Sequence, residues 1–196
     1  MIRFCTLTTI SFALLAASAP AQDALVEQVR EELASLDNYG VFDNISFQLN
    51  GGTVTLSGQA SQPQLKKQAE KVVRRIEGVQ QVTNEIEALP NSSEDDRIRT
   101  LAYIQIYGHP SLSRYNPNFG TPLFDSLVRR TFGLTQDPPP GNHPIHIVVK
   151  NNQITLEGVV DTEGDKTVAG MQANSVNGAM KVTNNLRVGN EKSKSG

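Results

Sequence analysis

The 196-residue sequence has no tryptophan, one cysteine and few aromatic residues. A single thiol, Cys5, excludes an internal disulfide framework and a zinc site built from several cysteines. The 18 basic and 20 acidic residues give a net charge of −2, which excludes the strongly basic composition of a nucleic-acid-binding protein. Hydrophobic residues still make up 38% of the chain, which is enough for a core in one or two domains.

The N-terminus is predicted to be a signal peptide. Arg3 comes before the apolar run FCTLTTISFALLAA, which has the length of a signal-peptide core and is short for a membrane span. Small-x-small cleavage motifs follow, and cleavage after Ala21 avoids placing Pro20 next to the cut. We therefore predict a signal peptide over residues 1–21 and a periplasmic or secreted mature chain of 196 − 21 = 175 residues. The alternative is an uncleaved N-terminal anchor.

The mature chain contains an internal repeat. At an offset of 100 residues and without a gap, residues 45–89 align with residues 145–189 at ten identical positions. The segment PNSSED between the repeats is typical of a loop. We predict a first domain over 22–89, a linker over 90–94, a second domain over 95–189 and a disordered tail over 190–196.

Each repeat shows the same order of hydrophobic periods. In the first, ISFQL and TVTLSG alternate around a Gly51-Gly52 turn and predict a β-hairpin, and residues 65–76 have helical spacing. The segment VTNEIEA predicts a third strand, parallel to the second because a helix between strands makes a right-handed crossover. Leading helices are expected near 23–36 and 95–107. The predicted fold class is α+β, with each unit helix-strand-strand-helix-strand and two helices packed on a three-stranded mixed sheet.

Six residues of the repeat are predicted to serve the fold. The glycines are expected at strand ends and helix caps, where the backbone needs freedom that only glycine has. The asparagines fall in the inward-facing row of the third strand, where an amide must find hydrogen-bond partners, so we expect them to hold a neighbouring backbone segment. These residues are Gly58, Gly78, Asn84, Gly158, Gly178 and Asn184.

The repeat resembles the BON domain. The resemblance is carried in the second repeat by Thr155-Leu156-Glu157-Gly158, by Ala169 and Ala173, and by Gly178 with the run Val182–Leu186. The first repeat matches more loosely. The resemblance implies an α+β fold, a non-catalytic role, similarity to tandem-BON proteins of the bacterial periplasm that are induced by osmotic stress, and attachment to phospholipid surfaces of the cell envelope.

No reactive constellation is visible in the sequence. His109, His143 and His146 are obvious candidates for a base or a ligand, but no second ligand cluster accompanies them, and ordinary loop or hydrogen-bonding roles are expected. A Gly-x-Ser-x-Gly elbow and a phosphate-binding glycine loop are both missing from the sequence. We predict that the protein is not an enzyme and uses no cofactor and no metal.

Two helices of the first domain carry opposite charges. Residues 22–44 have a net charge of 1 − 6 = −5, and residues 66–75 have 5 − 1 = +4. Because both helices should cover the same sheet face, we expect these charges to pair with one another at the surface. The alternative is a basic helix that binds lipid.

The second repeat has a long insertion, residues 108–144, where the first uses only residues 37–44. The run TPLFDSLVRRTFGL predicts a helix capped by Thr121, with Pro122 at its first position and Gly133 at its end. Basic and aromatic residues gather around it, as at an anionic lipid interface. The predicted lipid- or partner-binding surface comprises Arg97, Arg99, Tyr103, Tyr107, Arg114, Tyr115, Phe119, Phe124, Arg129, Arg130 and Phe132.

An alternative for the insertion is a helix that packs over the open face of the sheet. From the resemblance and the basic-aromatic surface, we expect a non-catalytic adaptor of the cell envelope that binds anionic phospholipid membranes. The alternative function is a protein–protein interaction or chaperone-like module for envelope proteins. The oligomeric state is left open.

Overall fold

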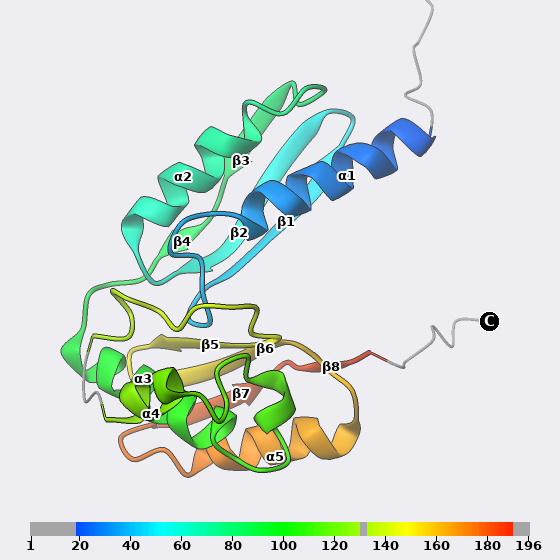
Figure 1. Ribbon diagram of the computed structural model, residues 1–196. Helices are drawn as coiled ribbons and strands as arrows, with labels where there is room; N and C mark the ends of the chain where they lie inside the picture. The colour runs from blue at the N-terminus through cyan, green and yellow to red at the C-terminus, as the bar shows by residue number, and fades with distance from the viewer. Residues whose placement is uncertain (1–18, 130–132, 190–196) are drawn as a thin grey trace, which may run out of the picture.

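The computed structural model describes residues 19–129 and 133–189. Most of the predicted signal peptide, the predicted tail over 190–196, and Arg130 and Phe132 lie outside the described residues. The described chain forms two α+β domains, one above the other in Figure 1.

The first domain follows the predicted order. Its elements are α1 (Ala19–Ala34), β1 (Asn44–Asn50), β2 (Thr53–Ala60), α2 (Pro63–Val73), β3 (Gln81–Asn84) and β4 (Glu87–Ala88). β1 pairs antiparallel with β2, and β2 pairs parallel with both β3 and β4. The two helices lie on the same side of this sheet (Figure 1).

The second domain repeats this plan and confirms the predicted α+β class. Its elements are α3 (Ser93–Tyr107), β5 (Ile145–Lys150), β6 (Gln153–Val160), α5 (Glu163–Asn174), β7 (Lys181–Asn184) and β8 (Arg187–Val188). The pairing of β5 with β6, and of β6 with β7 and β8, matches the first domain. α3 starts two residues before the predicted domain boundary, with the Ser92 hydroxyl accepting the Asp95 N–H at 3.2 Å.

The predicted third strand is split in both domains, so the sheets have four strands instead of three. The Asn84 side chain causes the interruption, because its Oδ1 accepts the Ile86 N–H at 3.2 Å while its Nδ2 donates to the Lys66 carbonyl at 2.8 Å. Asn184 makes the same two bonds, to Leu186 and to Lys166. The prediction that these asparagines hold a neighbouring backbone segment is confirmed.

The glycines serve the fold in other ways than predicted. Gly58 lies inside β2, not at its end, at φ +107°, and a Cβ there would come within 1.9 Å of the Asn44 carbonyl oxygen. Gly158 has the same role in β6. Gly78 is not a helix cap, because α2 ends earlier at Val73; Gly78 adopts φ +93° in the turn that Ile76 and Val79 close. Gly178 lies in the matching turn.

A turn of the first domain fills part of the second domain's core. Val41 and Phe42 are fully buried and belong to the hydrophobic cluster around α3, β5 and α5. The Ile147 N–H on the outer edge of β5 donates to the Val41 carbonyl at 2.7 Å. Gln62 also bonds the Thr135 carbonyl at 2.7 Å, and Lys150 pairs with Glu87 at 2.5 Å. These contacts join the two domains.

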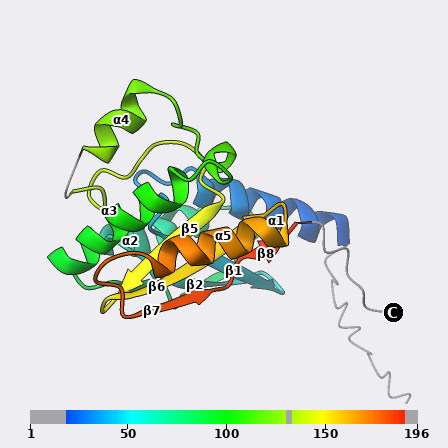
Figure 2. The same cartoon turned by 90° about the horizontal axis from the view of Figure 1, so that it is seen from below.

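The insertion covers α3 and the edge of β5. It contains the short 3-10 helix η1 (Ser113–Tyr115) and α4 (Pro122–Val128), which begins where predicted, with the Thr121 hydroxyl accepting the Phe124 N–H at 3.2 Å. α4 ends at Val128, before Gly133. The alternative that this helix packs over the open face of the sheet is wrong, because α4 lies over α3, on the helical side of the sheet (Figure 2). There the Phe124 ring lies 6.3 Å from the Tyr103 ring of α3.

Within the described ranges, no helix is both long and apolar enough to cross a membrane. The same residues contain no group of three or more His, Cys, Asp or Glu side chains arranged to hold a metal ion.

Candidate functional site

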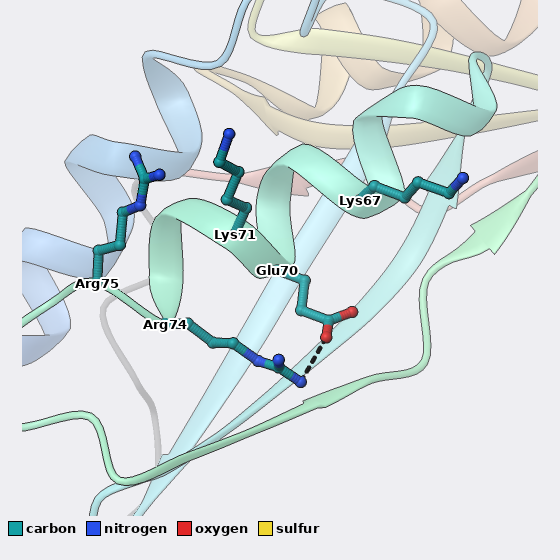
Figure 3. Close-up of a pocket in the computed structure, with 5 residues that line it drawn as sticks. All are labelled: Lys67, Glu70, Lys71, Arg74 and Arg75. Atoms are coloured by element: carbon teal, nitrogen blue, oxygen red, sulfur yellow. Dashed lines mark ion pairs between the residues drawn. The ribbon is translucent and has the colours of Figure 1, made fainter.

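The exposed face of α2 carries a cluster of basic side chains (Figure 3). Pro63 stands in the first turn, where its missing N–H costs nothing. Leu65, Ala69 and Val73 recur at a spacing of four and are buried against the sheet. The opposite face therefore points to solvent, and the basic residues lie there.

Four cations and one carboxylate form this cluster, which we call the basic face of α2: Lys67, Glu70, Lys71, Arg74 and Arg75. Its net charge is 4 − 1 = +3. The five residues line an open pocket of about 410 Å³. Arg74 pairs with Glu70 one helical turn away, at 2.6 Å. Lys67, Lys71 and Arg75 have no ion-pair partner among the described residues.

The expectation that α1 and α2 pair their charges is wrong for the residues that the structure describes. Glu27 of α1 pairs with Arg30 of the same helix, and Glu70 pairs within α2. Exposed ion pairs gain little free energy, so hydration and partners on the same helix replace pairing between the helices. The positive charge of α2 is left available.

The second domain lacks this cluster. In α5, which takes the place of α2, the residues equivalent to Lys67, Lys71, Arg74 and Arg75 are Thr167, Met171, Asn174 and Ser175. The buried positions of the two helices agree, since Ala69 and Val73 correspond to Ala169 and Ala173. The fold therefore does not need the basic face, which belongs to the first domain alone.

Of the surface predicted around the insertion, more than half of the described residues belong to the core. Five of its residues are buried: Arg99, Tyr103, Tyr107, Tyr115 and Phe124. Burial of the arginine and the three tyrosines is possible because each has at least one hydrogen-bond partner inside the fold. The Tyr107 hydroxyl donates to the Ile145 carbonyl at 2.6 Å, and Arg99 Nη2 donates to the Val149 carbonyl at 2.6 Å. Burial raises the pKa of Tyr103 to about 12 and lowers the pKa of Arg99.

Two further arginines of that surface are engaged in structural contacts. Arg97 pairs with Glu94 at 2.7 Å and reaches the Asn177 carbonyl at 3.2 Å. Arg114 pairs with Asp165 at the start of α5 and with Asp161 at 3.2 Å. Of the predicted set, Phe119 and Arg129 are exposed, like the apolar residues Leu123 and Val128 of α4. The Phe119 ring lies 5.8 Å from the Phe124 ring, and Arg129 has no ion-pair partner among the described residues.

The histidines lie at structural positions. His143 is buried, with its Nδ1 2.9 Å from the Gly141 carbonyl and its Nε2 3.4 Å from the Tyr103 hydroxyl. Burial lowers the pKa of His143 to about 4. The His146 ring lies 5.9 Å from the Tyr39 ring, between the domains, and burial lowers its pKa. His143 thus packs inside the second domain against Tyr103 and Tyr107, and only His146 contacts the first domain.

Sequence reasoning missed the turn over residues 40–43. The Asp43 carboxylate closes it by accepting the Gly40 N–H at 3.0 Å, and it also accepts the Ser61 N–H at 2.6 Å. Burial raises the pKa of Asp43, and these hydrogen bonds oppose the rise. The signal in the sequence is a pair of adjacent hydrophobic residues, Val41 and Phe42, in the short segment between the first helix and the first strand.

The architecture matches a known domain family. The BON domain family matches residues 21–90 and 127–190. The chain belongs to the BON domain family. Its two matches confirm the tandem arrangement, and the BON domain is in general a non-catalytic module. The second match begins inside α4 and omits α3, because the insertion separates α3 from the rest of this BON domain.

No curated protein matches the chain. Two solved structures of CdsD, a structural protein of the type III secretion system of Chlamydia trachomatis, are similar at 14% identity. One covers 86% of this chain and 94% of its own, with a TM-score of 0.26. The other, the C-terminal domain, covers 84% and 96%, with a TM-score of 0.25. At these TM-scores neither structure carries an argument about function.

Proposed function

We propose that this tandem-BON protein is a non-catalytic adaptor that binds anionic phospholipid membranes through the basic face of α2. The observation that carries the proposal is an exposed charge of +3 whose Lys67, Lys71 and Arg75 have no ion-pair partner in the described chain. Each basic residue near an anionic membrane contributes about 1 kcal/mol of binding. The site thus lies on the first domain, whereas the sequence indicated the insertion of the second.

The geometry favours contact with lipid headgroups over insertion into the bilayer. The apolar side of α2 is fully used in the core, since Leu65, Ala69 and Val73 are buried under the helix. α2 therefore has no free apolar face to bury among acyl chains, unlike a typical interfacial amphipathic helix. Binding should be electrostatic and reversible, and salt should weaken it, because the Debye length falls from about 10 Å at 0.1 M to about 3 Å at 1 M.

Vesicle co-sedimentation tests this function. The mature chain, residues 22–196, is mixed with vesicles of phosphatidylglycerol and phosphatidylcholine, or of phosphatidylcholine alone, at about 0.05 M and about 0.5 M salt. We expect the protein to sediment with the anionic vesicles at low salt and to stay in solution otherwise. If it stays in solution with both vesicles at low salt, the proposed function is wrong.

The second domain supplies a variant that the fold tolerates. Lys71→Met with Arg75→Ser introduces the residues that α5 carries at the same positions, Met171 and Ser175. Losing two such cations should weaken binding to anionic vesicles about 10- to 30-fold. The control is Arg129→Ser with Lys181→Thr, which removes the same charge from exposed sites on the second domain. If the control weakens binding as much as the α2 variant, the site on α2 is disproved.

A further inference from the structure

A groove at the junction of the two domains lies between α1 and the outer edge of β1 in the first domain and β8 in the second, with a volume of about 500 Å³. β1 pairs only with β2, so its outer edge has no strand beside it in the described chain. The groove is lined by apolar side chains with arginines among them: Val26, Arg30, Leu33, Ile45, Phe47, Leu49 and Arg187.

The equivalent position in the second domain is filled. The buried pair Val29 and Leu33 of α1 matches the pair Ala102 and Ile106 of α3, which are also four apart. When α1 and α3 are aligned on these two pairs, the groove residues Val26, Arg30 and Ala34 are equivalent to Arg99, Tyr103 and Tyr107. There the Phe42 ring packs 6.3 Å from the Tyr103 ring, and the Ile147 N–H of the strand edge donates to the Val41 carbonyl.

The exposure of the edge strand differs accordingly. Ile145, Ile147 and Val149 of β5 are fully buried under the turn over residues 40–43 and the insertion. The residues at the same positions of β1, which are Ile45, Phe47 and Leu49, are only partly buried. An open strand edge beside partly exposed apolar side chains is a typical site for binding another polypeptide.

We propose that this groove binds a short segment of a partner polypeptide that presents an aromatic side chain beside a free backbone carbonyl and a nearby carboxylate. The turn over residues 40–43 has this chemistry and occupies the equivalent position in the second domain. The charge of the groove agrees, because Arg187 is exposed and has no ion-pair partner among the described residues. The groove and the basic face of α2 lie on different elements, so this site is independent of membrane binding.

Peptide titration followed by amide NMR tests the proposal. The probe is the peptide DNYGVFDN, the sequence of residues 37–44, added to the ¹⁵N-labelled mature chain. We expect saturable shifts centred on β1 and α1, with a Kd of about 0.1–1 mM. The filled site in the second domain should not respond, because its own turn is tethered and has a much higher effective concentration. Replacing the phenylalanine of the peptide with alanine should abolish binding.

Variants of the groove locate the contact. Phe47→Ser should weaken peptide binding at least about tenfold, since an aromatic contact is lost. Arg187→Glu should weaken the acidic peptide and strengthen a peptide with lysines in place of its two aspartates. Val128→Ser is the matched control, because Val128 is an exposed apolar residue (41% accessible) on the distant α4. The amide spectrum of each variant reports whether it is folded.

Four outcomes would overturn the proposal. The first two are the absence of saturable shifts at about 2 mM peptide and shifts centred on α3 and β5. The third is an Arg187→Glu variant whose affinity for the peptide does not depend on the charge of the peptide. The fourth is a dimer of the free chain that Phe47→Ser dissociates. The last outcome would assign the groove to a second copy. Loss of vesicle binding in the α2 variant, with peptide binding unchanged, would show that the two sites act separately.

Discussion

Gly58 and Gly158 occupy the same position in the two sheets, and both need a backbone that only glycine adopts without strain. The φ angle of Gly158 is +117°, and an added Cβ would lie 2.0 Å from the Pro144 carbonyl oxygen. The carbonyl belongs to the chain entering the neighbouring strand, so it cannot move without disturbing β5. A side chain at either glycine therefore opposes the pairing of the hairpin strands.

We expect Gly158→Ala to lower the free energy of unfolding by about 2–4 kcal/mol, because both the φ angle and the space exclude a Cβ. Gly51→Ala is the control, since Gly51 also has a positive φ (+55°) but nothing lies within 4 Å of its added Cβ. The Gly51→Ala substitution should lower the free energy of unfolding by about 1 kcal/mol. Urea denaturation measures both, and equal losses would contradict the role of the Pro144 carbonyl.

His143 makes stability depend on pH. Burial holds its pKa at about 4 in the folded protein, below the value of 6.5 expected in the unfolded chain. The unfolded state therefore binds more protons between these values, so stability is complete above about pH 6.5 and is lost as the pH falls toward 4. The loss from this group is about 2–3 kcal/mol.

We expect the stability difference between the wild type and His143→Gln to shrink as the pH falls from 7 to 4. The glutamine side chain has no proton to gain, whereas the imidazole of His143 does. Other titrating groups, such as Asp43 with its raised pKa, are common to both proteins and cancel in the difference. Urea unfolding of both proteins at a series of pH values measures this difference in the free energy of unfolding. A difference that stays constant between pH 7 and pH 4 would contradict the prediction.

At the scale of elements, the insertion holds the start of α5. The Tyr115 hydroxyl of η1 accepts the Asp161 N–H at 2.8 Å and donates to the Asp165 carboxylate at 3.1 Å. Asp165 stands in the first turn of α5, where the Thr162 hydroxyl also bonds it at 2.6 Å. Part of the insertion thus has a structural role.

Tyr115→Phe should lower the free energy of unfolding by about 1–2 kcal/mol, because the bonds to Asp161 and Asp165 and a third from Arg114 are lost while the ring is kept. Amide exchange should become faster in the first turn of α5 and should not change in α2, which lies in the other domain. Unchanged exchange in α5 would show that η1 does not stabilise this helix.

The periodicity of the sequence was enough to predict the paired strands, the crossover helices and the start of α4, because these patterns are local. The periodicity could not predict that α4 packs against α3. The stripe of Phe124 and Leu127 indicates a buried face without saying which surface buries it. The composition around Tyr103 and Tyr107 suggested a membrane surface, but a tyrosine whose hydroxyl finds a carbonyl can also be buried. The basic face of α2 was visible in the sequence, and only its expected pairing with α1 was wrong.

At the scale of the molecule, the two domains share a core. Phe42 is encoded in the first domain and is fully buried in the second, against Tyr103. The cavity left by its removal would therefore lie in the second domain, beneath α3 and β5. The hydrophobic pair Val41 and Phe42 indicates burial, but the sequence pattern of one repeat cannot tell that the other domain buries it.

We expect Phe42→Ala to lower the free energy of unfolding by about 3–5 kcal/mol, as large-to-small changes in a core do. Amide exchange should rise most in α3 and β5, although the substituted residue lies in the first domain. Phe119→Ala is the control, because Phe119 is 47% exposed and should cost much less. Increased exchange confined to α1 and α2 would contradict the shared core.

The turn over residues 40–43 also has a consequence for the order of folding. The chain leaves the ribosome N-terminus first, at about 5–20 residues per second. About 105 residues separate Phe42 from Ile147, so roughly 5–20 s pass before the strand that covers this turn has been made. On whichever side of the membrane the chain folds, Val41 and Phe42 stay in contact with water or with a chaperone until the second domain closes over them.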